Sequence, residues 1–347
     1  MRQAVETTPQ QDSWFPGRDT CLRHRIVALG GGTGLATTLR GLRPLCFPTD
    51  ADTTVLTSAD KERLTAIVTV ADDGGSSGAL RRAYSILAPG DIRNCLLALA
   101  NSDSTLQDLF RFRFNGEVGG HSLGNLILTA LSEMECDFTT AVHRAGKMLG
   151  VCGRVLPATA DDVVIQAEFT DGSRLRGESR IAEARRQIQK ISLLPSWIGS
   201  LPEACDAIDE ADIIVIGPGS LYTSLIPTLL VPGIADAIAR SSARVILVMN
   251  LMTEVGETDG YCPADFLRAI NRHVPQMPVH YVLVNSTPIP GQLLSRYSVD
   301  GARPIIADSR RISETGCIPV FCDLLAKRRK VRHDPAKLTR AIFELAP

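Results

Sequence analysis

Residues 25–34 read Arg-Ile-Val-Ala-Leu-Gly-Gly-Gly-Thr-Gly, and this stretch decides the fold class. An apolar run that ends at once in glycines predicts a buried strand over 25–29 and a tight turn over 30–34. The apolar positions from Leu35 to Leu42 then predict a helix. Strand, glycine turn and helix in this order are typical of a parallel α/β sheet, because parallel strands need a crossover connection.

The same pattern returns along the chain. Short apolar runs without alternation predict buried strands at 65–70, 212–216, 244–250 and 279–284. Helical spacing of the apolar residues predicts a helical region at 91–149, and the chain closes on a predicted helix at 335–345. The segment from 151 differs, since its β-branched alternation and the pair Asp171-Gly172 favour a hairpin excursion, which we extend to about residue 200. We therefore expect a parallel sheet covered by helices on both faces, preceded by a loose tail over 1–24.

Composition and charge exclude several classes of protein. The 347 residues are 44% hydrophobic and 22% charged, which is ordinary for a globular protein and excludes wholesale disorder. A formal net charge of -1 argues against a nucleic-acid or anionic-membrane partner. No apolar run approaches the roughly 20 residues of a membrane helix, and no secretory signal opens the chain. Nine scattered cysteines predict free thiols in a reducing compartment, so we expect a cytoplasmic protein.

Ligands of parallel sheets bind at the carboxyl ends of the strands, so the glycine turns are the first candidates. Gly31, Gly32, Thr33 and Gly34 would offer backbone amides and the positive end of a helix dipole to a phosphate. The turn is not the dinucleotide fingerprint, which would need glycine at Leu35, and no lysine follows it as in a P-loop. A tight turn with a purely structural role is the alternative.

The strand over 65–70 runs into a second candidate segment. Asp72 and Asp73 suit ribose hydroxyls or a hydrated Mg²⁺, although helix capping is the plain alternative. The pattern Gly-x-Ser-x-Gly around Ser76 also matches a hydrolase nucleophile, for which Asp259 and His280 are conceivable partners.

Four further segments complete the candidate site. Segments 89–94 and 119–125 place polar side chains at the starts of two apolar helices. Asp91 and Ser122 are plausible caps of these helices. A ligand with a phosphate would find Arg93, Asn94, His121 and Asn125 there. A second glycine turn supplies Gly217, Gly219 and Ser220. The polar segment 250–261 ends in Tyr261, whose ring could stack on a base or a sugar.

Six motifs together resemble one known family. They read IVALGGGTG, VTVADDGGSSG, GDIRN, GGHSLGN, IGPGSLYTSLIP and GETDGY, in this order from about residue 25 to the final helix. The chain is similar to the CofD-like family and, within it, to the branch of bacterial gluconeogenesis factors called YvcK or GlmR. The tail and the basic run 327–330 lie outside this resemblance. The family more often has Gln-Pro where this chain has Glu254-Val255.

The resemblance implies a Rossmann-like three-layer α/β/α fold. It also implies a UDP-sugar ligand, UDP-N-acetylglucosamine, and a role in cell-wall precursor control and cell shape. Carried onto this chain, Gly31–Gly34 would hold the diphosphate, Asp72 and Asp73 would lie at the ligand, and Asn94, His121 and Asn125 would line the pocket. Tyr261 would contact the uridine or the sugar, and Arg296 would be a further candidate for contact with the nucleotide.

Our leading hypothesis is thus a regulatory UDP-sugar-binding protein without robust catalysis. It needs no cofactor, with Mg²⁺ on Asp72 and Asp73 as the one option. Its expected partners are a protein of cell-wall precursor synthesis and a second copy of the chain. The alternative is a Mg²⁺-dependent 2-phospho-L-lactate transferase acting on a deazaflavin precursor. The chain is only 5% aromatic, and Trp14 and Trp197 lie outside the glycine turns, which disfavours a stacking pocket for that tricyclic acceptor.

Overall fold

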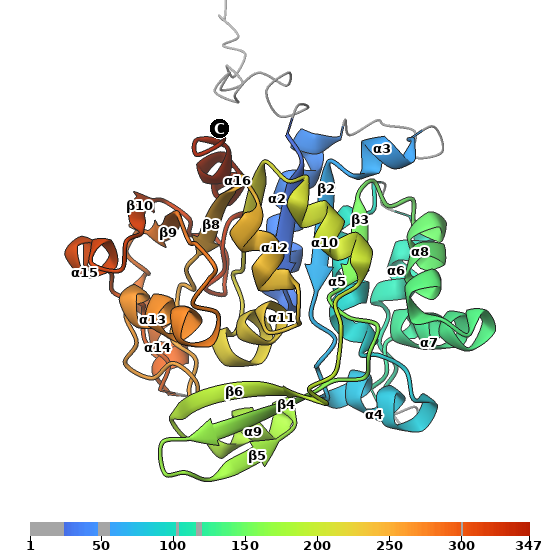
Figure 1. Cartoon of the computed structure of the whole chain (residues 1–347), viewed down its shortest axis with the longest axis horizontal. Helices are drawn as coiled ribbons and strands as arrows, with labels where there is room; N and C mark the ends of the chain where they lie inside the picture. Colours follow the sequence, from blue (N-terminus) through green and yellow to red (C-terminus); the bar gives the residue numbers. More distant parts are fainter. Residues whose placement is uncertain (1–23, 48–55, 102–103, 116–119, 300) are drawn as a thin grey trace, which may run out of the picture.

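The centre of the molecule is a parallel sheet of seven strands (Figure 1). The computed structural model describes residues 24–47, 56–101, 104–115, 120–299 and 301–347. In spatial order the strands are β10 (Ile318–Cys322), β9 (Tyr281–Asn285), β8 (Arg244–Val248), β7 (Ile213–Ile216), β1 (Ile26–Gly30), β2 (Leu64–Val68) and β3 (Arg154–Pro157). All six neighbouring pairs are parallel, which confirms the Rossmann-like α/β class. Of the tail predicted over 1–24, residues 1–23, with Trp14, lie outside the described part.

Helices cover the sheet on both faces. They are α2 (Gly32–Cys46), α3 (Ser58–Lys61), α4 (Gly75–Tyr84), α5 (Pro89–Leu99), α6 (Thr105–Arg111), α7 (Leu123–Glu135), α8 (Phe138–Met148), α9 (Glu178–Ala184), α10 (Pro202–Asp209), the π-helix η2 (Leu221–Leu225), α11 (Ile226–Leu229), α12 (Ile234–Arg240), α13 (Pro263–His273), α14 (Gly291–Ser298), α15 (Ser309–Ser313) and α16 (Pro335–Phe343). Among the described residues no single helix is long and apolar enough to span a membrane, although the bent pair Leu221–Leu229 and Ile234–Arg240 meets both criteria when joined.

The direction in which successive strands are added to the sheet reverses between β1 and β7, although the two strands are parallel. From β1 the chain crosses to β2 on one side, and from β7 it crosses to β8 on the other. Because such crossovers are right-handed, α2 and α12 must lie on opposite faces. Consistent with this, α2 packs against α5 and α16, whereas α12 packs against α10. A crevice therefore opens at the carboxyl ends of β1 and β7, where both glycine turns begin.

A second, smaller sheet forms most of the predicted excursion. It is antiparallel, in the order β5 (Arg174–Arg176), β4 (Val164–Phe169), β6 (Ile188–Leu194), and the Asp171-Gly172 turn joins β4 to β5. In Figure 1 it lies below the main sheet, next to α4 and together with α9. The expected range of 151–200 also contains β3, which pairs with β2 in the main sheet instead.

The strand β10 was not predicted. It lies at the edge of the main sheet and contains Pro319, which interrupts a strand pattern. The amide of Ile318 donates to the carbonyl oxygen of His280 (2.9 Å), and successive residues of a parallel strand face alternate neighbours. Position 319 therefore faces away from β9, so the proline nitrogen leaves no bond unmade.

Candidate functional site

The two glycine turns border one cavity of about 240 Å³ at the carboxyl ends of β1 and β7. Of the predicted site residues, the cavity contains Gly31, Gly32, Thr33, Gly34, Gly219 and Ser220. Its other lining residues come from α2, from the second turn and the residues after it, and from the segments that follow β8, β9 and β10: Thr37, Pro218, Ser224, Asn250, Leu251, Met252, Thr253, Glu254, Tyr297, Val331, Arg332 and His333.

Close approach of the two turns explains part of their glycine content. A methyl group on Gly34 would lie 2.1 Å from the carbonyl oxygen of Pro218, so no larger residue fits there. The buried hydroxyl of Thr38 lies 3.4 Å from the carbonyl oxygens of both Gly34 and Gly217. Gly32 differs, because its φ of +66° favours glycine while nothing lies within 4 Å of a methyl group built there. Its free side faces open space in which a ligand can approach the backbone.

A partly buried carboxylate binds the start of α2. Asp91 belongs to α5, yet its Oδ2 accepts a hydrogen bond of 2.6 Å from the amide of Gly32. The N-cap residue of α2, Gly31, has no side chain, so Asp91 supplies the missing cap from another element. Burial and then the charge of Asp72 raise the pKa of Asp91 to about 6, whereas the hydrogen bond from Gly32 acts to lower it. Asp91 does not cap α5, whose N-cap is Ala88.

Glu257 plays the same part at the second turn. Its carboxylate accepts hydrogen bonds from the amide of Tyr222 (3.1 Å) and the hydroxyl of Thr223 (2.8 Å) at the start of η2. Burial and the neighbouring Glu254 raise the pKa of Glu257 above its usual range. Two helix starts at the cavity are therefore each bound by an acidic side chain from elsewhere in the chain.

The segment after β8 provides polar groups on the cavity wall. The side-chain amide of Asn250 pairs with the Gly219 backbone, accepting from its N–H (3.1 Å) and donating to its carbonyl oxygen (2.9 Å). Burial raises the pKa of Glu254, which also lines the cavity, and the charge of Arg332 opposes the shift. Arg332 is exposed and brings a positive charge to the cavity.

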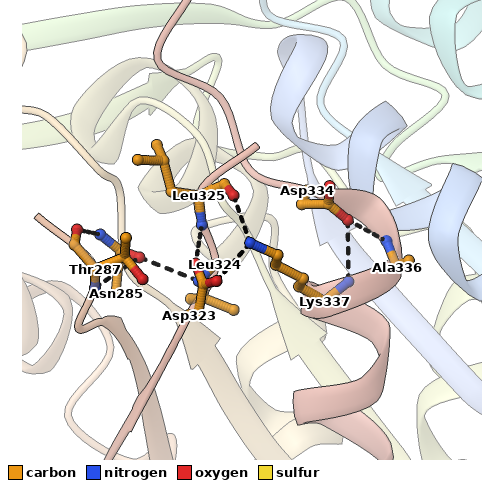
Figure 2. A network of polar contacts seen from close by, with 8 residues as sticks. All are labelled: Asn285, Thr287, Asp323, Leu324, Leu325, Asp334, Ala336 and Lys337. Carbon is orange, nitrogen blue, oxygen red and sulfur yellow. Dashed lines mark hydrogen bonds and ion pairs between the residues drawn. The ribbon is translucent and has the colours of Figure 1, made fainter. Parts of the chain in front are cut away.

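The residues 331–333 reach the cavity because a polar network holds both ends of their segment (Figure 2). Asn285, at the end of β9, accepts from the amide of Leu324 (3.1 Å). Lys337 of α16 donates to Asp323 and to the carbonyl oxygen of Leu325 (3.0 Å). Leu325 then forms an antiparallel bridge with His333.

His333 itself is buried and neutral. Its Nε2 donates to the carbonyl oxygen of Met249 (3.1 Å). Burial lowers the pKa of His333 to about 4, so the ring carries no charge at pH 7.

The predicted carboxylate pair is divided between two roles. Asp73 accepts from both the amide and the hydroxyl of Ser179 (2.8 Å each) and so caps α9, not the adjacent α4. Asp72 accepts from the amide of Gly74 (2.9 Å). Glu178 lies beside this turn, and burial and the charge of Asp72 raise its pKa to about 7.

The described residues include no group of three or more His, Cys, Asp or Glu side chains arranged to hold a metal ion. Mg²⁺ is often bound by one or two carboxylates together with substrate phosphates. The expected magnesium ligands Asp72 and Asp73 stay a prediction: Ser179 donates only to Oδ1 of Asp73, and Glu178 is a third carboxylate beside the same turn.

Four of the predicted polar residues form one directed chain of hydrogen bonds with Ser76. Arg93 donates to Asn125 Oδ1 (2.9 Å) and to Asn94 Oδ1 (2.9 Å), and Asn125 Nδ2 donates to Ser76 Oγ (3.0 Å). Ser76 Oγ lies 2.9 Å from His121 Nδ1. Since the Asn125 amide already donates to Ser76 Oγ, the hydroxyl proton is available to the imidazole. Ser122 caps α7, as predicted, through the amide of Asn125 (3.1 Å).

The hydrolase partners conceived for Ser76 are wrong. His280 Nδ1 accepts from the amide of Val245 on β8 (2.9 Å), and Asp259 accepts from the amide of Gly256 (2.7 Å). Both side chains therefore serve their local backbone. The imidazole that meets Ser76 belongs to His121 instead.

Tyr261 does not line the cavity. Its ring packs edge-on against Tyr222 and Phe266, and its hydroxyl lies 3.0 Å from that of Tyr222. The aromatic residue in the cavity is Tyr297, whose hydroxyl accepts from the amide of Val331 (3.1 Å). Arg296 lies one position before it, on α14, and donates to the carbonyl oxygen of Arg329 (3.4 Å).

Fold and cavity define a Rossmann-like α/β protein with a cavity at the switch point of its sheet. The chain belongs to the CofD family, described as 2-phospho-L-lactate transferase CofD, which matches residues 26–325. A protein of Nostoc sp. (strain PCC 7120) is 46% identical over 338 residues, covering 94% of this chain and 71% of that protein. The gluconeogenesis factor of Bacillus subtilis (strain 168) is 43% identical, covering 92% of this chain and 98% of its own length. The crystal structure of a UPF0052 family member from Bacillus halodurans has a TM-score of 0.85 at 42% identity, covering 92% and 98%.

Proposed function

We propose that the cavity binds UDP-N-acetylglucosamine and that the chain is a cytoplasmic regulator, a gluconeogenesis factor that controls cell-wall precursor supply and cell shape. The observation that carries the proposal is the meeting of two glycine turns on one cavity at the sheet's switch point. Two such turns suit a ligand with a diphosphate bridge. Similar proteins of Bacillus subtilis and Halalkalibacterium halodurans are named gluconeogenesis factors, which supports that part of the proposal.

The diphosphate fits best on the amides of Thr33 and Gly34. These belong to the first turn of α2, where backbone amides have no partner within the helix. The Gly32 amide is occupied by Asp91, so it is not available to the ligand. Arg332, which lines the same cavity and is exposed, adds a positive charge.

The two ends of the ligand follow from the cavity's chemistry. Met252, Tyr297 and Val331 give one end an apolar and aromatic wall, which suits the uracil ring. The sugar would then extend toward the side of the small sheet, where Asp72, His121, Asn125 and Tyr261 offer hydroxyl partners and a ring face. The segment that ends in Tyr261 packs tightly against the end of α9 beside the small sheet. A methyl group placed on Gly256 would lie only 2.8 Å from the Cα of Arg185.

The alternative activity is Mg²⁺-dependent transfer of 2-phospho-L-lactate to a deazaflavin precursor. The acidic group around Asp72 and Glu178 favours it, because a metal ion could neutralise a diphosphate there. In a turnover assay with a guanosine diphospho-lactate donor, a deazaflavin acceptor and Mg²⁺, we expect no product at enzymatic rates. Product formation at roughly 1 s⁻¹ or faster would refute the proposed regulatory function and support the transferase activity.

A thermal-shift screen tests the ligand class itself. UDP-N-acetylglucosamine at a hundredfold excess over its Kd should stabilise the native state by about 2.7 kcal/mol and raise the melting temperature. NAD should raise it little, since the first turn lacks the dinucleotide fingerprint. A shift with NAD and none with the UDP-sugar would refute the proposed ligand.

A further inference from the structure

A second cavity, of about 390 Å³, lies at the other end of the main sheet. It is bordered by α3, α5, α8 and the start of β3, so it opens near the amino ends of β2 and β3. Figure 1 shows α3 above this end of β3 and α8 to its right, well away from the small sheet. None of its lining residues lines the glycine-turn cavity.

The wall of this cavity is apolar. Leu96 of α5, Val142 of α8, Val151 and Val155 supply aliphatic side chains. Gly146 of α8 lies among them, and a methyl group there would be 3.6 Å from Leu96 and 3.8 Å from Val151. These are ordinary contact distances, so the helix leaves space at this position that a small side chain could fill without strain.

The rim of the cavity is positively charged. Lys61, His143, Lys147 and Arg154 surround it, with Glu62 as its one acid. Glu62 is shared between Arg154 (3.5 Å) and Arg25 (3.7 Å). Within the described residues, neither Lys61 nor Lys147 has a carboxylate within 4.0 Å. The chain has only six lysines among its 37 basic residues, and two of them lie at this rim.

The neighbouring imidazole of His143 is affected by burial and by charges of both signs, since Glu203 and Asp137 act against the basic residues. Partial loss of water and the charge of Arg154 lower the pKa of His143, and Lys147 acts in the same direction. An apolar wall with a few convergent charges is the usual character of a small-molecule site, and this volume lies in the usual range.

We propose that this cavity is a binding site for a small organic anion with an apolar body. The carboxylate or phosphate group of the ligand lies between Lys61 and Lys147, and its hydrocarbon part packs against Leu96 and Val151. The site is separate from the nucleotide cavity, so it does not depend on the proposed function.

Four probes separate the two parts of this recognition. Hexanoate carries both the charge and the hydrocarbon, hexanol only the hydrocarbon, and acetate and inorganic phosphate only the charge. Ligand-observed saturation-transfer NMR on the full chain should show binding of hexanoate that is at least threefold tighter than that of hexanol. Acetate and phosphate should bind more weakly still, because they leave the apolar wall uncovered.

Variants then locate the binding. Lys61→Gln and Lys147→Gln should each weaken hexanoate binding roughly threefold, since an exposed charge pair contributes modestly. Gly146→Leu should abolish hexanoate binding, because the leucine side chain would occupy the space beside the apolar wall. The substitution replaces a glycine within a helix, so the fold should persist. Lys190→Gln, on β6 and outside this cavity, is the matched control and should bind hexanoate like wild type.

Unchanged hexanoate binding in the double variant Lys61→Gln/Lys147→Gln and in Gly146→Leu would overturn the proposal. Equal binding of hexanol and hexanoate would overturn its anionic part, and no binding of any probe would overturn it entirely. UDP-N-acetylglucosamine binding should stay the same in all five variants, which keeps this test apart from that of the nucleotide cavity.

Discussion

The carboxylate of Asp91 accepts a hydrogen bond of 2.6 Å from the amide of Gly32, 59 residues earlier in the chain. This contact joins α5 to the first turn of α2 and directs the remaining free amides of that turn toward the cavity. It also places a partly buried negative charge next to the position proposed for the diphosphate. The stability of the turn and its affinity for an anion are therefore linked through one side chain.

The first prediction concerns that cap. Asp91→Ala should lower the free energy of unfolding by about 1–2 kcal/mol, because the Gly32 amide loses its partner inside the protein. Asp91→Asn keeps an oxygen acceptor and should lose less than half as much. Chemical denaturation followed by circular dichroism measures both values. Equal stability of Asp91→Ala and wild type would show that the contact does not stabilise α2.

The second prediction is a pH dependence of ligand binding. The pKa of Asp91 is already raised to about 6, and a bound diphosphate would raise it further by repulsion between like charges. Binding then takes up a proton, so affinity for UDP-N-acetylglucosamine should increase as the pH falls from 8 to 6, by up to about tenfold, and level off below 6. In Asp91→Asn this increase should be lost and affinity at pH 8 should be higher than in wild type. Calorimetric titrations at several pH values test this, and an identical pH profile in the variant would contradict it.

The third prediction uses two glycines with the same backbone requirement. Gly32 and Gly172 have φ values of +66° and +80°, and neither has an atom within 4 Å of a methyl group built on it. Gly32→Val and Gly172→Val should therefore both cost about 1–2 kcal/mol of stability. Only Gly32→Val should also lose the thermal shift with UDP-N-acetylglucosamine, because its side chain enters the cavity. A preserved shift in Gly32→Val would remove the first turn from the site.

The fourth prediction assigns the two tyrosines to different ends of the ligand. Tyr297→Leu should weaken both UDP and UDP-N-acetylglucosamine roughly tenfold, since a stacked base is lost. Tyr261→Ala should weaken only the UDP-sugar, and Tyr261→Phe should bind it like wild type because the ring remains. Competition titrations with the two nucleotides separate these outcomes. A loss of UDP affinity in Tyr261→Ala would place Tyr261 at the nucleotide instead of the sugar.

Local patterns predicted the strands and turns that build the site, because strand, glycine turn and helix follow one another in the chain. The pairing of β1 with β7 was beyond such reasoning, since it joins distant segments. The four-residue β3 and the proline-containing β10 were missed because neither shows a strand pattern of sufficient length.

The candidate site was predicted in the same uneven way. Both glycine turns and the group Arg93, Asn125 and His121 were recognisable as polar or flexible residues at element ends. Asp91 was expected to cap its own helix, and only the packing of α5 on α2 directs it to Gly32. No local signal marks Val331–His333, which reach the cavity through the network of Asn285, Asp323 and Lys337 (Figure 2).

The most direct test of the central claim is calorimetric titration of the full chain with UDP-N-acetylglucosamine at pH 7. The account predicts one molecule bound per chain, competition by UDP, and no binding to Gly32→Val under conditions where Gly172→Val binds normally. A titration without binding heat at several temperatures, or equal binding by the two valine variants, would contradict it.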